Sequence, residues 1–385
     1  MRLLIGMPHK ESYGGPPACE PPFVEELKKL NVEVTEFVYT HEEKRDRRPT
    51  ISERVVRVIR TALSLRRTLR SHNYDLVHLN TSFDFKALLR DFATVVLISP
   101  YKGRLFLKMH GSDAGLLRTR NPILRLMIRA LFSRVHGIGV LSSEERDNFI
   151  RSGLCKFEVF KVRSALKAGL YVHDPQFAET HGLPEGTPVL LYISRFIHSK
   201  GLIDTIRASK IVLDQGLAFA LFCVGDGPAR QEAEQEVERL GMQACVKFFG
   251  YVPEHATDTF YANSSILLLP TAHFEGLPLV ILHSLAAGIP IITTRIRGAA
   301  DYLLEPRNCL WTEARKPEML AAKIVELLNS SETRAQMSRN NRDLAQQFSA
   351  NVTVQEYVCI FEELITRGAV QPRRQAQTSI AATFR

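Results

Sequence analysis

Long apolar runs are absent from this sequence. No stretch approaches the roughly 18 consecutive apolar residues of a membrane-spanning helix. The opening MRLLIGMP reaches a proline at Pro8, which favours a first strand over a secretory signal. The six cysteines form no C-x-x-C pair and are scattered through apolar segments, which favours reduced core thiols over disulfides. We therefore expect a cytoplasmic protein.

Metal and cofactor motifs are also missing. No two aspartates are separated by a single residue, and neither H-E-x-x-H nor a Walker A loop occurs. The twelve histidines show no metal-ligand spacing. A complete G-x-G-x-x-G is lacking, which counts against a dinucleotide cofactor. We expect no obligatory metal and no cofactor.

The positive charge of the chain lies in its first half. The 385 residues are 45% hydrophobic and 24% charged, which is typical of a soluble globular protein of two or three domains. Residues 1–180 hold 30 Lys and Arg against 20 Asp and Glu, whereas residues 181–385 hold 20 against 21. Such an excess suits nucleic acid, an anionic membrane or a phosphorylated ligand.

Short apolar runs alternate with helical patterns in both halves. RLLIGM, VEVTEFV, YDLVHL, RLFLKM and HGIGVL predict strands in the first half, and PVLLYIS, AFALFCV, CVKFFG, SILLLP and IPIITT in the second. The alternation predicts an α/β protein with two doubly wound, Rossmann-like domains. The polar stretch 173–188 predicts a linker between a domain of residues 1–175 and one of residues 186–365, followed by a polar tail at 366–385.

Loops at the carboxyl ends of the strands are where such sheets bind ligands. Gly14 and Gly15 follow the first strand, where they either let a phosphate or sugar approach the backbone or form a plain flexible loop. Arg195 and Lys200 follow the first strand of the second half, beside a helix N-terminus. Two cations there suit a diphosphate, and a solvated basic loop is the alternative.

The segment TAHFEGLPLVILH carries the strongest signal. Pro278 predicts a helix start, so the backbone amides between Gly276 and Leu279 form a candidate anion site. Glu275, just before them, can accept hydrogen bonds from sugar hydroxyls. On the other domain, His110 ends the strand KMH and faces the same cleft, where it is either functional or structural.

The order and spacing of these elements resemble the GT-B glycosyltransferases of family 4, which are retaining enzymes that use nucleotide sugars. The resemblance covers about residues 1–365 and is strongest between 189 and 294. It rests on the glycine pair, HGSD, an R-x4-K-G loop, VGDGP, F-x-G-Y-V-P and E-G-L-P. It implies the GT-B fold, in which two domains face a cleft and C-terminal helices pack back towards the N-terminal domain.

The resemblance also implies roles for individual residues. Glu275 would bind hydroxyls of the transferred sugar and His110 would approach that sugar, which makes these two the candidate catalytic residues. Arg195 and Lys200 would hold the donor diphosphate. The implied donor-binding set is Gly15, Arg195, Lys200, Gly250, Tyr251, Val252, Gly276, Leu277, Pro278, Leu279 and His283.

Three segments depart from the family pattern. His283 stands where the family usually has a second glutamate that binds the ribose. An imidazole there can form one hydrogen bond to the ribose or, when protonated, contact phosphate, and both interpretations remain open. The usual P-N-G-V-D before the linker is replaced by KVRSALKAG, and the usual G-G-x-x-E reads RGAAD from Arg297 to Asp301.

The function implied is transfer of a sugar, with retention of configuration, from a UDP- or GDP-sugar to a hydroxyl of a glycan or lipid-linked acceptor. Cell-surface polysaccharide or lipopolysaccharide biosynthesis is the expected setting, and cations and helix amides would stabilise the departing diphosphate. The alternative, suggested by His283, is a sugar-nucleotide-binding protein without turnover. Nucleic-acid binding is disfavoured because no aromatic-basic platform accompanies the charge.

A basic amphipathic helix is predicted over residues 53–70. One face carries Val55, Val58, Ala62, Leu65 and Leu69, and the other carries Arg57, Arg60, Arg67 and Arg70. Such a helix can lie on an anionic membrane surface, or it can simply pack its apolar face on the sheet. The two interpretations are compatible if only the arginines touch lipid.

Overall fold

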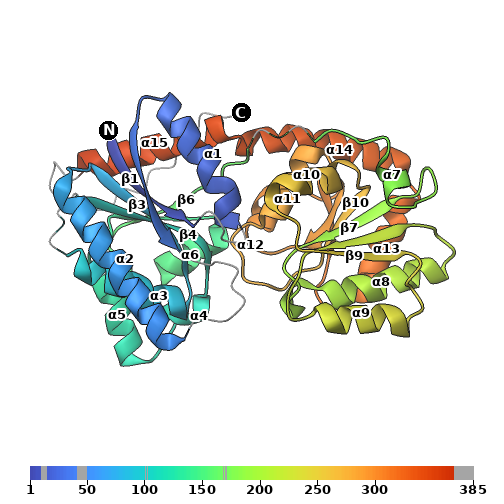
Figure 1. Cartoon of the computed structure of the whole chain (residues 1–385), viewed down its shortest axis with the longest axis horizontal. Helices are drawn as coiled ribbons and strands as arrows, with labels where there is room; N and C mark the ends of the chain where they lie inside the picture. Colours follow the sequence, from blue (N-terminus) through green and yellow to red (C-terminus); the bar gives the residue numbers. More distant parts are fainter. Residues whose placement is uncertain are drawn as a thin grey trace.

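Two parallel β-sheets lie side by side, each with helices on both faces (Figure 1). This computed structural model describes residues 1–9, 15–40, 50–99, 101, 103–167, 169 and 171–367. The predicted tail therefore lies, from residue 368 onward, outside the described residues. The two doubly wound sheets confirm the predicted fold class.

Each described sheet has six strands. The first sheet has the order β2-β1-β3-β4-β5-β6, and the second has the order β12-β11-β10-β7-β8-β9. The strands of the first sheet are β1 (Arg2–Pro8), β2 (Glu33–Thr40), β3 (Leu76–Phe83), β4 (Arg104–Ser112), β5 (Gly137–Val140) and β6 (Glu158–Lys161). Those of the second are β7 (Val189–Ile193), β8 (Ala220–Val224), β9 (Val246–Gly250), β10 (Ile266–Leu269), β11 (Ile291–Thr294) and β12 (Cys309–Thr312). The edge strands β6 and β12 were not predicted, because neither EVFK nor CLWT belongs to a longer apolar run.

Helices cover both faces of the first sheet. One face carries α2 (Ile51–Ser71), α3 (Phe85–Leu97) and α5 (Pro122–Phe132), and the other carries α1 (Gly15–Lys29) and α15 (Ala350–Arg367) (Figure 1). The short α4 (Ala114–Leu117) and α6 (Ser143–Arg151) complete this domain.

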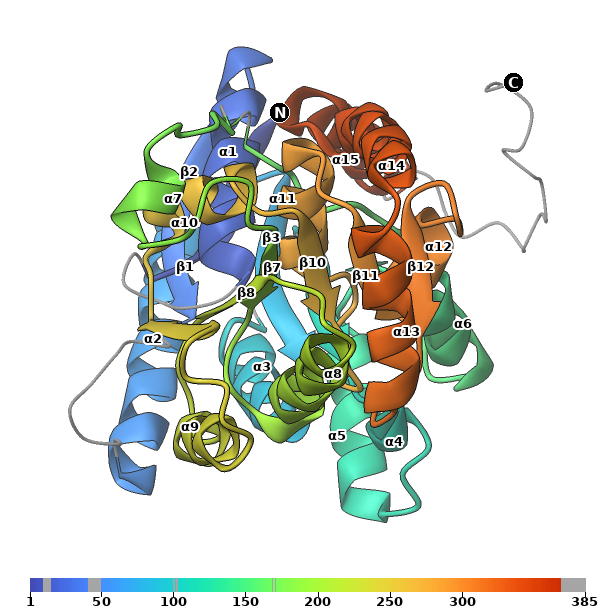
Figure 2. The same cartoon turned by 90° about the vertical axis from the view of Figure 1, so that its right-hand side faces the viewer.

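The second sheet is covered in the same way. Figure 2 shows α8 (Leu202–Asp214), α9 (Arg230–Arg239) and α13 (Pro317–Leu328) on one side and α10 (Glu254–Ala262), α11 (Leu279–Ala287) and α14 (Ser331–Ala345) on the other. Helix α12 (Arg297–Tyr302) lies against α6 of the first domain. Two 3-10 turns (His198–Lys200 and Gln346–Phe348) and the short α7 (Phe177–Thr180) complete the elements. Helix α7 lies within the predicted linker and buries Phe177 in the core.

Helix α1 begins at Gly15 and not, as the sequence pattern predicts, near Phe23. Proline lacks an N–H and therefore normally argues against a helix interior, yet Pro21 and Pro22 lie inside this one. The helix is anchored by the buried residues that precede these prolines, Cys19 and Glu20, of which Glu20 has no exposed surface. The early start carries Glu20 into the domain interior.

The last helix crosses back to the first domain. On α15, Tyr357 packs against Phe23 of α1 with ring centroids 4.7 Å apart, and Phe361 packs against Phe106 of β4 at 5.6 Å. His78 of β3 stacks on Tyr357 at 5.9 Å. This arrangement confirms that C-terminal helices pack back towards the N-terminal domain.

Helix α2 buries only part of its apolar surface. Ala62, Leu65 and Leu69 are buried as the helical projection predicts, but Val55 is 52% exposed. The interpretation in which the whole apolar face packs on the sheet therefore does not hold for Val55. Among the described residues, no helix has both the length and the apolar character needed to cross a membrane.

Candidate active site

A buried lysine follows the first strand of the second sheet. After β7, the 3-10 turn His198–Lys200 carries Lys200 to a position where 4% of the residue is exposed. Burial lowers the pKa of this ammonium, the Glu275 carboxylate raises it, and the charge of Arg195 lowers it again, with a net lowering. Arg195 itself is exposed. The two predicted cations therefore lie on one loop, where Lys200 is buried and Arg195 is exposed.

Glu275 is the partner of Lys200. One Glu275 carboxylate oxygen contacts the Lys200 ammonium, while 31% of the Glu275 side chain stays exposed. The two loops come together because Gly201, at φ +81°, lets the chain pass the end of β10, where an added Cβ would lie 2.5 Å from the Pro270 carbonyl oxygen. The Glu275 carboxylate therefore balances the buried charge of Lys200, and its exposed part can still accept hydrogen bonds from a ligand.

The loop after Glu275 is wedged between the two domains. An added Cβ on Gly276 would lie 2.6 Å from the Leu141 Cβ of the first domain. The Gly276 carbonyl accepts a hydrogen bond from the Gly298 amide at 2.8 Å. Leu277 is buried, and Pro278 is the N-cap of α11, which begins at Leu279. These residues hold the domain contact, and the anion-binding role of their amides stays a prediction.

His110 approaches the same loop from the first domain. It lies near the end of β4, and an added Cβ on its neighbour Gly111 would lie 3.2 Å from the Phe274 carbonyl oxygen and 3.8 Å from the Glu275 Cα. The structure therefore brings the end of the strand that carries His110 next to the loop that carries Glu275.

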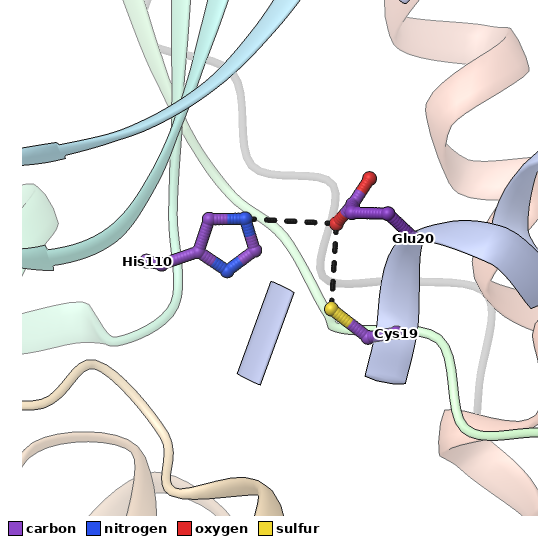
Figure 3. A group of neighbouring side chains, drawn as sticks. All are labelled: Cys19, Glu20 and His110. Atoms are coloured by element: carbon purple, nitrogen blue, oxygen red, sulfur yellow. Dashed lines mark hydrogen bonds and ion pairs between the residues drawn. The ribbon is translucent and has the colours of Figure 1, made fainter. Parts of the chain in front are cut away.

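A buried polar cluster supports His110 from behind (Figure 3). Glu20 accepts a hydrogen bond from Lys108 Nζ at 2.6 Å and another from Asn80 Nδ2 at 2.9 Å. The side chains of Lys108 and Glu20 are both 0% exposed. His110 Nε2 lies 3.0 Å from Asn80 Oδ1 and 3.6 Å from Glu20 Oε1.

These hydrogen bonds determine which His110 nitrogen carries the proton. Asn80 Nδ2 donates to Glu20 and to the Gly6 carbonyl oxygen at 3.0 Å, so Asn80 Oδ1 must be the atom that faces His110. Because Oδ1 can only accept, His110 Nε2 donates and Nδ1 is an acceptor. Figure 3 shows Nδ1 pointing away from Glu20, and within the described chain no hydrogen bond engages it.

The cluster also sets the charges of its members. Burial raises the pKa of Glu20, but the positive charge of Lys108 and the neighbouring His110 outweigh it and leave that pKa at about 2. Burial, followed by the charge of Lys108, lowers the pKa of His110 to about 3. At neutral pH, Glu20 is therefore ionised and His110 is a neutral hydrogen-bond acceptor.

Among the described residues, Cys19, Glu20 and His110 are the one group of three side chains that could together bind a metal ion, with their ligand atoms within 4.8 Å of one another. The residues do not fit a metal ion. The Lys108 ammonium already supplies the cation next to Glu20. Burial, with Glu20 as the next cause, raises the pKa of Cys19, whereas a metal needs the thiolate. The cluster is a buried ion pair with a supporting role.

Arg297 joins the domains on the other side of Gly276. Its guanidinium donates to the Ser112 carbonyl oxygen at 2.8 Å and lies 3.3 Å from Glu145 Oε1, both in the first domain. Asp301 of the same segment accepts a hydrogen bond from the Ser143 amide at 2.6 Å. The RGAAD segment, which departs from the family pattern, therefore forms a polar clamp between the domains.

His283 lies on α11 and is 8% exposed. The Tyr171 hydroxyl is 2.7 Å from its Nδ1, and Glu254 Oε1 is 2.7 Å from its Nε2. Tyr171 lies two residues after KVRSALKAG, the second segment that departs from the family pattern, and Glu254 begins α10. Neither residue was singled out from the sequence.

The remaining predicted donor-binding residues surround these groups. An added Cβ on Gly15 would lie 3.4 Å from the Leu279 Cδ1, so the start of α1 faces the start of α11, whereas Gly14 lies outside the described residues. Gly250 ends β9 at φ +68°, and Tyr251 is 46% exposed. Val252 packs against the core.

The buried partners of His110 were missed by sequence reasoning. Lys108 offered a signal, because a charged residue within the apolar run RLFLKM needs a buried counter-charge. Glu20 offered none, because its segment ACEPP is typical of a loop. Asn80 lies at the end of a strand pattern, where polar residues are common.

Two family models match the chain. Residues 23–160 match the model described as glycosyltransferase family 4, and residues 174–344 match glycosyl transferases group 1. The chain belongs to the group 1 glycosyltransferases of family 4. The resemblance seen in its motifs is thereby confirmed.

Curated relatives are similar over part of their length. Two uncharacterised glycosyltransferases of Methanocaldococcus jannaschii are 23% and 26% identical over 187 and 174 residues, which are 48% and 45% of this chain. The capsular polysaccharide biosynthesis glycosyltransferase CapM of Staphylococcus aureus is 25% identical over 189 residues, 48% of each chain. The chain thus spans about half the length of the curated relatives it matches.

Solved structures show the GT-B fold. The sucrose-phosphate synthase of Thermosynechococcus elongatus aligns with a TM-score of 0.76 at 16% identity, covering 95% of this glycosyltransferase and 99% of that chain. HepE of Anabaena, solved in complex with UDP-glucose, aligns with a TM-score of 0.70 at 18% identity, covering 94% and 100%. At these identities the likeness concerns the fold alone.

Proposed function

We propose that this glycosyltransferase moves a sugar from a UDP- or GDP-sugar to a hydroxyl of a glycan or lipid-linked acceptor, with retention of anomeric configuration and without a metal. The observation that carries the proposal is the Lys200–Glu275 pair at the domain junction, next to Gly111 of the first domain. A cation for a diphosphate and a carboxylate for sugar hydroxyls then lie side by side. HepE, whose structure contains UDP-glucose, supports a nucleotide-sugar donor.

The chemistry assigned to the site is mainly electrostatic. Lys200 and Arg195 stabilise the charge that develops on the departing diphosphate. Glu275 positions the transferred sugar through its hydroxyls, and His110 Nδ1 accepts a hydrogen bond from a donor on the substrate. Because His110 is neutral and bound through Nε2, it orients the substrate and does not supply a proton. In the front-face scheme, the leaving phosphate itself takes the proton of the acceptor hydroxyl.

The biosynthetic setting follows from the names of relatives. CapM is described as acting in capsular polysaccharide biosynthesis, and WcaL of Escherichia coli, 22% identical over 186 residues, as a putative colanic acid biosynthesis glycosyltransferase. These names favour cell-surface polysaccharide or lipopolysaccharide biosynthesis. They also favour turnover over the alternative of a binding protein without activity.

Release of nucleoside diphosphate tests the proposed function. Purified protein is incubated with a panel of UDP- and GDP-sugars, with and without lipid and oligosaccharide acceptors. Wild type should release the diphosphate with one donor. Glu275→Gln should lose at least about a hundredfold in rate at a temperature where its melting curve shows it to be folded, since the substitution also removes the counter-charge of buried Lys200. Glu313→Gln, an exposed carboxylate after β12, is the control. Undiminished release by Glu275→Gln would contradict the assignment.

A membrane-bound acceptor is favoured by one face of the first domain. Helices α2, α3 and α5 lie side by side, with 10 Lys and Arg against 2 Asp and Glu in their sequences. The exposed apolar side chains of this basic helical face include Ile51, Val55, Ile59, Ile123 and Leu126. Basic residues around exposed apolar ones suit the headgroup region of an anionic bilayer.

Vesicle binding tests this part of the proposal. Arg57, Arg60, Arg67 and Arg70 are changed together to glutamine. Each basic residue near an anionic surface contributes about 1 kcal/mol, so the variant should no longer sediment with vesicles containing anionic lipid. Wild type should bind vesicles that contain anionic lipid and should not bind neutral vesicles. Equal binding of wild type to both would refute the electrostatic argument.

A further inference from the structure

His283 is fixed on two sides within the second domain. Its ring stacks on Tyr261 with centroids 5.2 Å apart and 22° between the planes. The Tyr171 hydroxyl contacts Nδ1 at 2.7 Å. The imidazole therefore has one orientation, and that orientation directs Nε2 towards Glu254.

The contact between His283 and Glu254 is incomplete. The Nε2 to Oε1 distance is 2.7 Å, but the carboxylate lies off the direction of the ring N–H, so buried Nε2 lacks an aligned hydrogen-bond partner in the described chain. A buried donor in this state costs free energy, and such groups are normally satisfied by something else. Glu254 keeps 53% of its side chain exposed, so the pair is open on one side.

The pair lies along the path of an extended ligand. Glu254 begins α10 immediately after the loop that leaves β9, and His283 is on the helix that follows Glu275. Strands β10, β7, β8 and β9 are successive neighbours, and all end at the same edge of the sheet. A ligand that places its phosphates at Lys200, between β7 and β10, and extends along this edge towards β9 reaches Glu254 next.

We propose that Glu254 recognises the ribose of the nucleotide donor by accepting hydrogen bonds from its vicinal hydroxyls, and that His283, beside this carboxylate, donates its single N–H, on Nε2, to one ribose oxygen. A carboxylate can accept from both hydroxyls of a diol, whereas an imidazole cannot. The inference rests on the proposed function, because it requires a nucleotide in the cleft. It moves the main ribose contact from α11, where the resemblance to the family implies it, to α10.

Titration calorimetry with ribose and deoxyribose nucleotides tests the assignment. The probes are UDP and GDP, each compared with its 2′-deoxy counterpart. Wild type should bind the ribonucleotide about tenfold more tightly, since a hydrogen bond to a charged group is lost with the hydroxyl. In Glu254→Gln this preference should fall to about threefold or less, with the affinity for the deoxynucleotide unchanged within about twofold.

Two further variants separate recognition from general structure. Glu326→Gln, on α13, removes a carboxylate of similar exposure (50%) and should keep the full preference for ribose. His283→Phe keeps the stacking on Tyr261 and removes both ring nitrogens, so it should lower the ribose preference. A merely structural role of His283 would change the melting temperature and leave this ratio intact.

The outcomes distinguish this inference from the proposed function. If Glu254→Gln binds the ribonucleotide with undiminished preference, Glu254 does not recognise the ribose, although the protein still binds nucleotides. If the preference disappears in His283→Phe and persists in Glu254→Gln, the contact belongs to His283 and the inference is overturned. If wild type binds neither UDP nor GDP, the proposed function fails and this inference fails with it.

Discussion

Replacing Glu20 by glutamine should destabilise the first domain strongly. Glutamine keeps the shape of the side chain, but Lys108 and Asn80 donate to different oxygens of Glu20 and the amide has a single acceptor oxygen, so one of the two donors then faces an NH2 group. The substitution also removes the negative charge and leaves the Lys108 ammonium at 0% exposure with no counter-ion. The variant therefore measures the loss of the negative charge together with one hydrogen bond.

Two lines of reasoning give the same magnitude. Each pKa unit corresponds to about 1.4 kcal/mol, so lowering the pKa of Glu20 from its ordinary 4.5 to about 2 corresponds to about 3 kcal/mol. Removing one partner of a buried ion pair typically costs about 3–5 kcal/mol. For a domain of this size, about 3 kcal/mol lowers Tm by roughly 6–12 °C.

The assay is chemical denaturation of wild type and Glu20→Gln between pH 7 and pH 3. The folded pKa of Glu20 is depressed, so its contribution is present above pH 4.5 and is lost as the pH falls towards 2. The difference between the two proteins should therefore shrink below pH 4.5. Glu26→Gln, on the same helix, removes the partly buried partner of exposed Lys29 and should leave the midpoint unchanged.

A difference below about 1 kcal/mol at pH 7 would refute the reasoning, and so would a difference that stays constant down to pH 3. Either result would mean that water or a rearranged side chain neutralises Lys108 when Glu20 is lost. Both proteins retain His78 and His110, so the difference between the curves, and not either curve alone, reports on Glu20.

Two other substitutions have defined outcomes. Lys200→Ala should weaken binding of nucleoside diphosphate by about tenfold or more, the equivalent of one charge-assisted hydrogen bond, and calorimetry showing less than a twofold change would exclude Lys200 from the diphosphate site; Lys210→Ala on α8 is the control. Arg297→Ala should lower the free energy of unfolding by about 2–3 kcal/mol, because it leaves Glu145 buried without its cation, and an unchanged urea midpoint would contradict the proposed domain clamp.

Much of the architecture could be predicted from the sequence. Strands such as β1, β3 and β7 are buried on both faces and appear as continuous apolar runs, which are hard to misinterpret. The loop positions of Lys200, Glu275 and His110 followed from the rule that ligands bind at the carboxyl ends of strands. Lys200 and Glu275 approach each other because β7 and β10 are neighbours in the sheet and Gly201 lets their loops meet.

The supporting residues could not be predicted, because each depends on contacts between distant segments. Glu20 and Lys108 are 88 residues apart, and their pairing requires α1 to begin among prolines that normally end a helix. Tyr171 and His283 are 112 residues apart, and Arg297 and Ser112 are 185 apart. A local sequence pattern cannot indicate contacts between residues that lie so far apart in the chain.

The return of α15 to the first domain has a consequence for synthesis on the ribosome. Phe23, His78 and Phe106 are all 0% exposed only when Tyr357 and Phe361 cover them. Nearly two hundred residues separate β6 from that helix. The nascent first domain must therefore emerge with an uncovered aromatic face and wait while the entire second domain is translated. Among the described residues α15 is what covers this face, so truncation before residue 350 should leave the face exposed.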